Sequence, residues 1–105
     1  MLTDTLPSQL AFLTAAEANG LPVLFVELGN EFYNNVADNI AMFPTGADYG
    51  TMATTWMAAV RAAHPAAAIS VVGVPSSHGK PRTSEWNQMM FYACWCAPRR
   101  GDARV

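Results

Sequence analysis

The chain has 105 residues, of which 51% are hydrophobic and 13% are charged, and its formal net charge is −2. This length fits one small domain, and the apolar content excludes an intrinsically disordered chain. No basic stripe provides an electrostatic footprint for nucleic acid, and no run of about 20 apolar residues predicts a membrane-spanning helix. The first residues, MLTDTLPSQ, have no visible export signal, so the compartment stays open.

The first part of the chain predicts a helix followed by a buried strand. Residues 7–19 have a helical pattern, with Pro7 suited to the first turn and Gly20 placed where a helix should stop. Residues 23–28 are an apolar run interrupted only by Glu27, which is typical of a strand buried on both faces of a parallel sheet. Residues 32–44 are predicted to be a long connection.

A second helix and a second strand are expected next. Thr45 and Asp48 have the spacing of a capping pair, which predicts a helix from about Thr45 to the residues before Pro65. Residues 67–74 form a second continuous apolar run rich in β-branched residues, and such a run predicts a strand.

The last predicted helix covers residues 85–96, with Thr83 and Ser84 as candidate caps and with Trp86 and Trp95 in the core. Residues 102–105 are a candidate start of another strand. Helices and strands therefore take turns along the chain, an order that favours parallel βαβ units with the helices outside the sheet.

Two polar residues follow the first predicted strand directly. Asn30 and Glu31 come after Gly29, a residue that lets the backbone turn sharply. In α/β folds, functional groups gather at the carboxyl ends of parallel strands. A carboxylic acid partly shielded from water there keeps its proton and can donate it to a leaving group, as glycoside hydrolysis requires.

The stretch ELGNEFY, residues 27–33, resembles the acid/base signature of retaining glycoside hydrolases of clan A, among them arabinofuranosidase-like and glucuronidase- or heparanase-like enzymes. In that clan the Asn-Glu pair ends the fourth strand of a (β/α)8 barrel. The resemblance implies that Glu31 is the general acid/base and that Asn30 bonds a sugar hydroxyl beside the scissile bond.

The resemblance continues, in order, over nearly the whole chain. The segments QLAFLTAAEANGLPV, FPTGADYGTMATTWMAAVRAAHP, AAISVVGVP and RTSEWNQMMF are similar to the elements around the fourth and fifth strands, and GDARV resembles the entry to the sixth. The implied fold class is α/β, a partial (β/α)8 (TIM) barrel of about strands four to six with their helices. Residues 1–105 then form a single incomplete catalytic domain.

A complete barrel needs about 250 residues, and the clan's nucleophile is a second glutamate at the end of the seventh strand. None of the remaining acids, Asp38, Asp48, Glu85 and Asp102, matches that position. We therefore expect a fragment of a retaining glycoside hydrolase that has the acid/base, lacks the nucleophile and is inactive by itself.

Two further residues are candidate contacts to a carbohydrate. Tyr33, with Phe32, has an aromatic face that suits a sugar ring, and ordinary loop packing explains it equally well. His78 follows the second predicted strand on the expected active face, where a solvated loop histidine is the alternative. Aligned metal ligands and a phosphate-binding glycine loop are absent from the sequence, so no metal or cofactor is expected.

Three functional hypotheses stay open. In the first, the partner is a carbohydrate substrate of a full-length parent, which the resemblance implies is secreted or lysosomal. In the second, the chain is a small non-catalytic α/β domain that binds a ligand or a protein partner, and its sheet edges are covered. In the third, half-barrels self-associate through exposed sheet edges.

Overall fold

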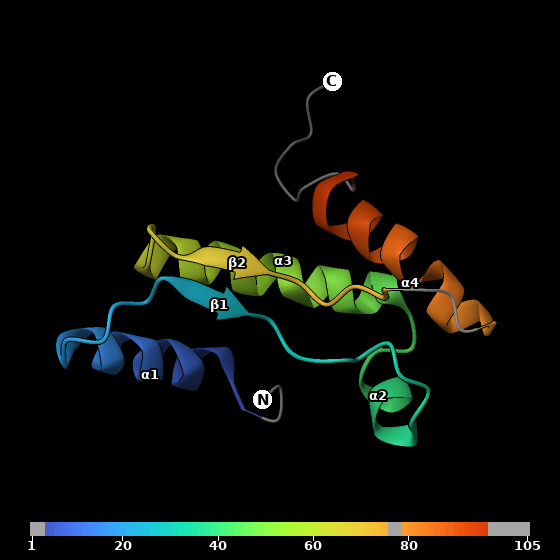
Figure 1. The fold of residues 1–105 in the computed structure, drawn as a ribbon, viewed down its shortest axis with the longest axis horizontal. Coiled ribbons are helices and arrows are strands. Elements are labelled where there is room, and N and C mark those ends of the chain that lie inside the picture. The colour runs from blue at the N-terminus through green and yellow to red at the C-terminus, as the bar shows by residue number, and fades with distance from the viewer. Residues whose placement is uncertain (1–3, 76–78, 97–105) are drawn as a thin grey trace.

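Helices and strands alternate in the computed structural model, which describes residues 4–75 and 79–96. This part of the chain is mixed α/β, with four α-helices and a two-stranded parallel sheet (Figure 1). The elements in chain order are α1 (Leu6–Ala18), β1 (Phe25–Glu27), α2 (Ala37–Met42), α3 (Gly46–Ala63), β2 (Ala68–Ser70), α4 (Pro81–Phe91) and the π-helical turn η1 (Tyr92–Cys96).

The expected parallel pairing of the two strands is confirmed. Phe25 stands opposite Ala68, and Glu27 opposite Ser70. Both strands are shorter than the predicted ranges 23–28 and 67–74, because only three residue pairs stay in register. Beyond these pairs the segments that follow the two strands separate, and side chains from the helices form hydrogen bonds with their backbone groups. Residues 102–105, the candidate start of a further strand, lie outside the described residues.

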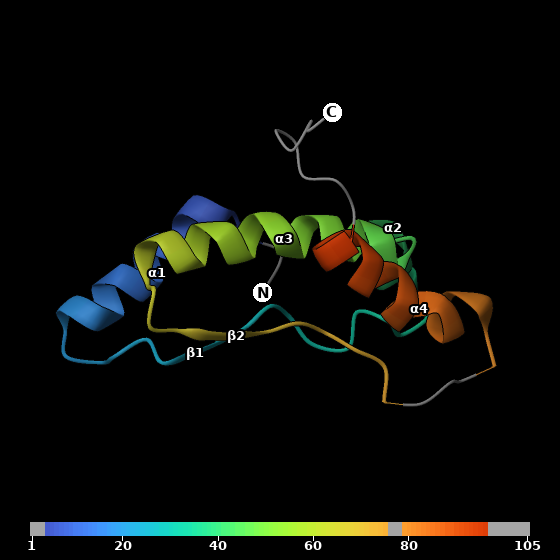
Figure 2. The same ribbon diagram turned by 90° about the horizontal axis from the view of Figure 1, so that it is seen from above.

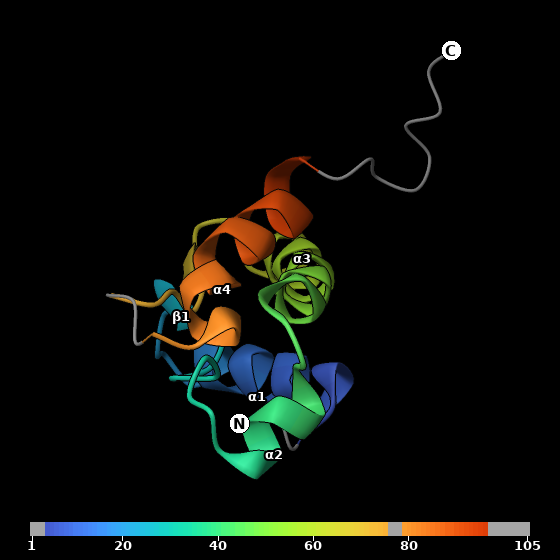
Figure 3. The ribbon, with the colours of Figure 1, turned by 90° about the vertical axis from the view of Figure 1, so that its right-hand side faces the viewer.

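The helices cover one side of the sheet. In Figure 2, α1 and α3 lie on the same side of both strands, and Figure 3 shows α4 crossing beside α3. Leu28 is buried toward this helical layer, whereas Leu24 and Phe25 are 64% and 62% exposed. The prediction that the first strand is buried on both faces is therefore wrong for the described chain, because a second layer is missing there.

The start of α3 follows the sequence signal. The Thr45 hydroxyl accepts a hydrogen bond from the Asp48 N–H at 3.3 Å, and the Asp48 carboxylate accepts one from the Thr45 N–H at 2.9 Å. This reciprocal capping box satisfies two backbone donors that a helix start otherwise leaves unpaired. The predicted capping pair is confirmed.

The predicted start of the last helix is wrong. This helix, α4, begins at Pro81, with Lys80 as its N-cap, because the fixed φ of proline suits the first helical position. Thr83 lies inside the helix, buried, and its hydroxyl accepts a hydrogen bond from the Asn35 amide at 2.8 Å. The Ser84 hydroxyl donates to the Lys80 carbonyl at 2.6 Å.

Two other expectations need correction. The connection 32–44 contains the short helix α2, whose apolar residues are exposed and gave no helical stripe. Trp95 is 48% exposed and contacts Phe91, one turn earlier, in a tilted arrangement with 5.0 Å between the ring centres, instead of entering the core. Trp86, by contrast, is fully buried as predicted.

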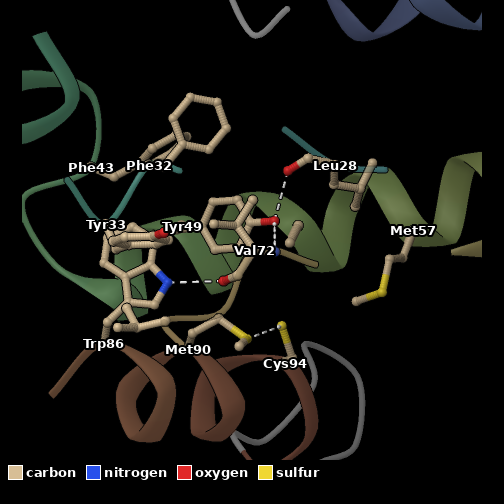
Figure 4. Packing of buried hydrophobic residues seen from close by; sticks show 12 residues of the cluster. Leu28, Phe32, Tyr33, Phe43, Tyr49, Met57, Val72, Trp86, Met90 and Cys94 are labelled. Atoms are coloured by element: carbon tan, nitrogen blue, oxygen red, sulfur yellow. Dashed lines mark hydrogen bonds between the residues drawn. The ribbon is translucent and has the colours of Figure 1, made fainter. Parts of the chain in front are cut away.

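The core lies between α3, α4 and the carboxyl ends of the strands. Tyr49 and Trp86 are its largest fully buried side chains, and their rings stack at 5.5 Å (Figure 4). Phe32 and Phe43 extend this aromatic group, with edge contacts from Phe43 to Phe32 at 5.2 Å and to Tyr49 at 5.4 Å. Such pairs add to the stabilisation that comes from burial alone.

Helix α1 has no fully buried residue, and polar contacts help to hold it against α3. His64, buried at the end of α3, has its Nδ1 2.6 Å from the Glu17 carboxylate and its Nε2 3.5 Å from the Thr14 hydroxyl. One ring thus joins the ends of two helices that are far apart in the sequence.

Glycine allows α3 and α4 to approach closely. A Cβ on Gly46 would lie 2.3 Å from the carbonyl oxygen of Trp86, and a Cβ on Gly50 would lie 2.7 Å from that of Met90. Both distances are too short for any side chain, and both involve backbone atoms, which cannot rotate away.

We expect Gly46→Ala to lower the free energy of unfolding by about 2 kcal/mol, as overpacking does in a tight core. Chemical denaturation of the purified chain measures this value. Ala58→Gly, at an exposed position of the same helix, is the control and should cost about 1 kcal/mol from helix propensity alone. A Gly46→Ala protein more stable than the parent would contradict the close contact.

Candidate functional site

The backbone turns sharply directly after β1. Gly29 has φ +99°, in the region that favours glycine, and a Cβ there would lie 1.8 Å from the Phe32 ring. Glycine is therefore required both for the conformation and for the close approach of the ring. The sharp turn expected at Gly29 is confirmed, and it directs the next two residues to the end of the sheet.

Asn30 and Glu31 lie in an open groove between the carboxyl ends of the two strands. Both side chains are exposed, and the groove has a volume of about 260 Å³. Its lining comes from both strand ends, namely Glu27, Gly29, Asn30, Glu31, Tyr33, Ser70, Val71, Val72 and Gly73. The sequence thus predicted correctly that the Asn-Glu pair follows the strand end, but the expected partial shielding of Glu31 from water is missing in the described chain.

Glu31 has a backbone conformation that glutamate rarely adopts. Its φ is +48°, and it is the non-glycine residue with positive φ among the described residues. The backbone carbonyl of Glu31 accepts hydrogen bonds from the Asn34 N–H at 3.0 Å and the Asn39 amide at 3.3 Å. The Asn34 amide also donates to the Glu31 carboxylate at 3.2 Å. These hydrogen bonds from the following turn therefore stabilise Glu31 in a left-handed conformation that costs on the order of 1 kcal/mol.

The two other candidate residues have different outcomes. The Tyr33 side chain is 8% exposed and belongs to the core cluster, as loop packing predicts, while its edge also lines the groove. His78 lies outside the described residues.

The Tyr49 hydroxyl connects the two strand ends beneath the groove. It donates a hydrogen bond to the Leu28 carbonyl at 2.7 Å and accepts one from the Val72 N–H at 2.8 Å (Figure 4). It therefore lies where a backbone hydrogen bond between the two segments would continue the sheet if they did not separate. Burial raises the pKa of Tyr49 from its usual 10.0 to about 12.

The chain after β2 is held by α4. The Trp86 indole N–H donates to the Val72 carbonyl at 2.9 Å. The Asn87 amide group bonds both backbone groups of Val74, accepting from its N–H at 2.7 Å and donating to its carbonyl at 2.9 Å. These side-chain hydrogen bonds thus fix residues 72–74 beside the groove.

Arg82 fixes the connection that follows Glu31. Its guanidinium lies 5.0 Å from the centre of the Trp86 ring, and carboxylates of the described residues form no ion pair with it. Partial burial lowers the pKa of Arg82. The guanidinium donates to backbone carbonyls at distances of 2.7–3.3 Å, namely those of Phe32, Tyr33, Asn34, Asn39, Phe43 and Pro44.

Sequence reasoning missed these supporting residues. Tyr49 lies on the apolar face of α3, and an apolar helical pattern does not reveal where a hydroxyl finds its hydrogen-bond partner. Arg82 lies 38–50 residues from the carbonyls that it binds, and no local pattern marks it. The arrangement can present one carboxyl group and one amide to a ligand in the groove. Within residues 4–75 and 79–96, groups of three or more His, Cys, Asp or Glu side chains suited to hold a metal ion are absent.

We expect Tyr49→Phe to cost 1–3 kcal/mol (about the desolvation penalty of an unpaired buried group), because Leu28 and Val72 lose their shared partner. In the parent protein, stability should also fall between pH 10 and pH 12. Over that range the unfolded chain releases the phenol proton that the folded chain keeps. The difference between the two pKa values corresponds to about 3 kcal/mol of the free energy of unfolding.

Unfolding by denaturant at a series of pH values tests both parts. Tyr49→Phe should show a flatter decline above pH 10, whereas Tyr92→Phe, at an exposed tyrosine, should follow the parent. Equal slopes for the parent and Tyr49→Phe would mean that the phenol is not buried in this network.

We expect Glu31→Gly to raise the free energy of unfolding by about 1 kcal/mol, since glycine adopts positive φ without strain. Glu31→Gln keeps the shape and the conformational cost, so its stability should match that of the parent. Thermal and chemical denaturation of the three proteins give the values. A loss of stability in Glu31→Gly would remove the argument that this position is strained.

Comparisons with known proteins give no assignment. No family model, curated protein or solved structure matches the chain. None of the described helices is long and apolar enough to cross a membrane.

Proposed function

We propose that this chain is the part of a retaining glycoside hydrolase domain that carries the general acid/base, Glu31. One observation supports this most directly: a glutamate in a left-handed conformation stands at the groove where two parallel strands end. Strained residues cluster at active sites, where a required side-chain position outweighs the local cost. Asn30, beside it in the same groove, is proposed to bond a sugar hydroxyl.

The architecture supports a sector of a (β/α)8 barrel, about strands four to six. In such barrels the strands are parallel, the helices lie outside, and catalytic groups follow the carboxyl ends of the strands. The helices here cover one side of a parallel sheet, and β1 and β2 pair only with each other among the described residues. A small self-contained binding domain would be expected to cover these edges, so the open sheet favours the incomplete barrel.

The proposed reaction is a double displacement at the anomeric carbon. In the first step the Glu31 carboxylic acid gives its proton to the glycosidic oxygen, and a carboxylate nucleophile forms a bond to the anomeric carbon as the C–O bond breaks. In the second step the Glu31 carboxylate takes a proton from water. That water attacks the same carbon and releases the nucleophile, so the configuration is retained.

The second carboxyl group must lie about 5–5.5 Å from the first. Glu27 lines the same groove, but it belongs to β1 itself and the resemblance gives it no role. The nucleophile is therefore proposed to come from outside these 105 residues. The open strand edges would serve to bind the missing strands or, through self-association, another copy.

We expect the purified 105-residue chain to release no product from a panel of aryl glycosides, because the nucleophile is lacking. Absorbance of the released phenol measures turnover. Clear turnover that Glu31→Gln leaves unchanged would exclude the proposed role of Glu31, and turnover abolished by Glu31→Gln would refute the claim that this chain lacks a nucleophile.

A longer protein provides the positive test. We expect a reading frame that continues past codon 105 to encode a further glutamate after an apolar strand. In that protein Glu31→Ala should lose activity and regain it on activated aryl glycosides when azide is added, because azide replaces the water that the acid/base would activate. Lack of rescue, or full activity in Glu31→Ala, would argue against the assignment.

A further inference from the structure

A buried histidine joins α1 and α3 away from the groove that contains Glu31. His64 directly follows α3, and its side chain is 3% exposed. Its Nδ1 lies 2.6 Å from the carboxylate of Glu17, and its Nε2 lies 3.5 Å from the hydroxyl of Thr14. Because His64 precedes β2, this group of side chains lies toward the amino ends of the strands, near the ends of α1 and α3 (Figure 1). It is therefore separate from the proposed acid/base.

The partners of the His64 ring determine which of its nitrogens carries the proton. An ionised carboxylate only accepts hydrogen bonds, so the neutral imidazole donates from Nδ1 to Glu17. Nε2 then has a lone pair that points to Thr14, and the hydroxyl of Thr14 is the donor in their contact. The three groups are therefore connected in the order hydroxyl, imidazole and carboxylate.

This order is that of the nucleophile, the general base and the positioning carboxylate in enzymes that form an acyl intermediate on a hydroxyl. The contact of 3.5 Å is longer than in a tight hydrogen bond, as is common for catalytic contacts before a substrate binds. The carboxylate orients the ring and stabilises the imidazolium that forms when Nε2 takes a proton. Thr14 is exposed on α1, so a small molecule can reach its hydroxyl from solvent.

We propose that Thr14 is a nucleophile that accepts an acyl group from an activated ester, with His64 as its general base and Glu17 as the residue that positions the ring. In the first step the Thr14 oxygen forms a bond to the acyl carbon, and the hydroxyl proton passes to His64 Nε2. The bond from the acyl carbon to the leaving group breaks, and the leaving group takes the electron pair and the proton of the imidazolium. Water then reacts in the same way with acylated Thr14, which releases the acid and restores the hydroxyl.

The position of Thr14 inside α1 limits the class of acyl donor. Backbone N–H groups in the middle of a helix bond carbonyls of the preceding turn, so α1 itself offers none there to stabilise an oxyanion. Aryl esters and thioesters depend less on such stabilisation, because their leaving groups hold negative charge more readily than an alkoxide does. Acylated Thr14 is an ester of an ordinary alcohol and reacts more slowly with water, so the acylated chain should accumulate.

An activated aryl ester, para-nitrophenyl acetate, tests the proposal on the 105-residue chain. Mass spectrometry of proteolytic peptides identifies the acetylated residue and measures the rate at which it is modified. Thr14→Val removes the hydroxyl, and Thr14→Ser keeps a less hindered one. Thr55→Val is the matched control, because it removes another exposed hydroxyl from a helix. Circular dichroism and the denaturation midpoint show whether each variant keeps the fold.

We expect acetylation of Thr14 in the parent, an unchanged rate in Thr55→Val and a rate at least as high at the new serine of Thr14→Ser. His64→Gln should slow the reaction about a hundredfold or more, as the loss of general-base catalysis does. Glu17→Gln should also slow it while the fold is kept, since the ring loses the carboxylate that positions it.

The pH dependence of the rate separates a general base from a structural contact. In the parent, acetylation of Thr14 should become faster as the imidazole loses its proton and then reach a plateau, because only the neutral ring accepts the hydroxyl proton. Glu17 is the charged side chain in contact with the ring among the described residues. His64→Gln should lose this plateau.

Three results would overturn the proposal. Acetylation of Lys80 or other amines without acetylation of Thr14 would show that this hydroxyl is not activated. Equal rates at Thr14 in the parent and in folded His64→Gln would leave the ring with a structural role alone. If His64→Gln does not fold, an unchanged rate in Glu17→Gln together with a parent rate that shows no plateau would lead to the same conclusion.

Discussion

The Tyr49 hydroxyl sets the distance between the two strand ends, and the groove depends on that distance. Parallel pairing stops after three residue pairs, and backbone groups that are buried beyond it need other partners. Tyr49 satisfies the Leu28 carbonyl on one side and the Val72 N–H on the other with a single oxygen atom. The strand ends can therefore separate without leaving these two groups unpaired. Asn30 and Glu31 line the open space that results.

Arg82 gives the same kind of support to the chain after Glu31. A guanidinium has five N–H donors and normally finds a carboxylate, but this one binds six backbone carbonyls of residues 32–44 instead. The connection is irregular apart from α2, so its carbonyls have few other partners. A strained residue persists only where its surroundings over-determine its conformation. By fixing the residues directly after it, Arg82 contributes to the conformation of Glu31 without touching its side chain.

The sequence predicted what depends on neighbouring residues and missed what depends on distant ones. The helix after Thr45, its capping box and the buried Trp86 all follow from local spacing. The position of Asn30 and Glu31 also followed, since polar residues directly after an apolar run mark a strand end. The strands were predicted too long because hydrophobicity indicates burial and not pairing, and Val72 and Val74 are held by side chains of α3 and α4. The positive φ of Glu31 could not be predicted from the sequence, because glutamate rarely adopts that conformation.

The stabilising contacts of this chain are distributed unevenly, and that distribution bears on the proposed function. The aromatic core, the close helix contact at Gly46 and the Arg82 network all lie on the helical side or at the carboxyl ends of the strands. Among the described residues, the sheet itself contributes three residue pairs, and its outer edge and far face are open. Because the supports of the groove do not pass through that edge, a strand can join the sheet there without disturbing Tyr49 or Arg82. The geometry around Glu31 is therefore set without the rest of the sheet. A catalytic group at a strand end requires this if further strands are to supply the other residues of the site.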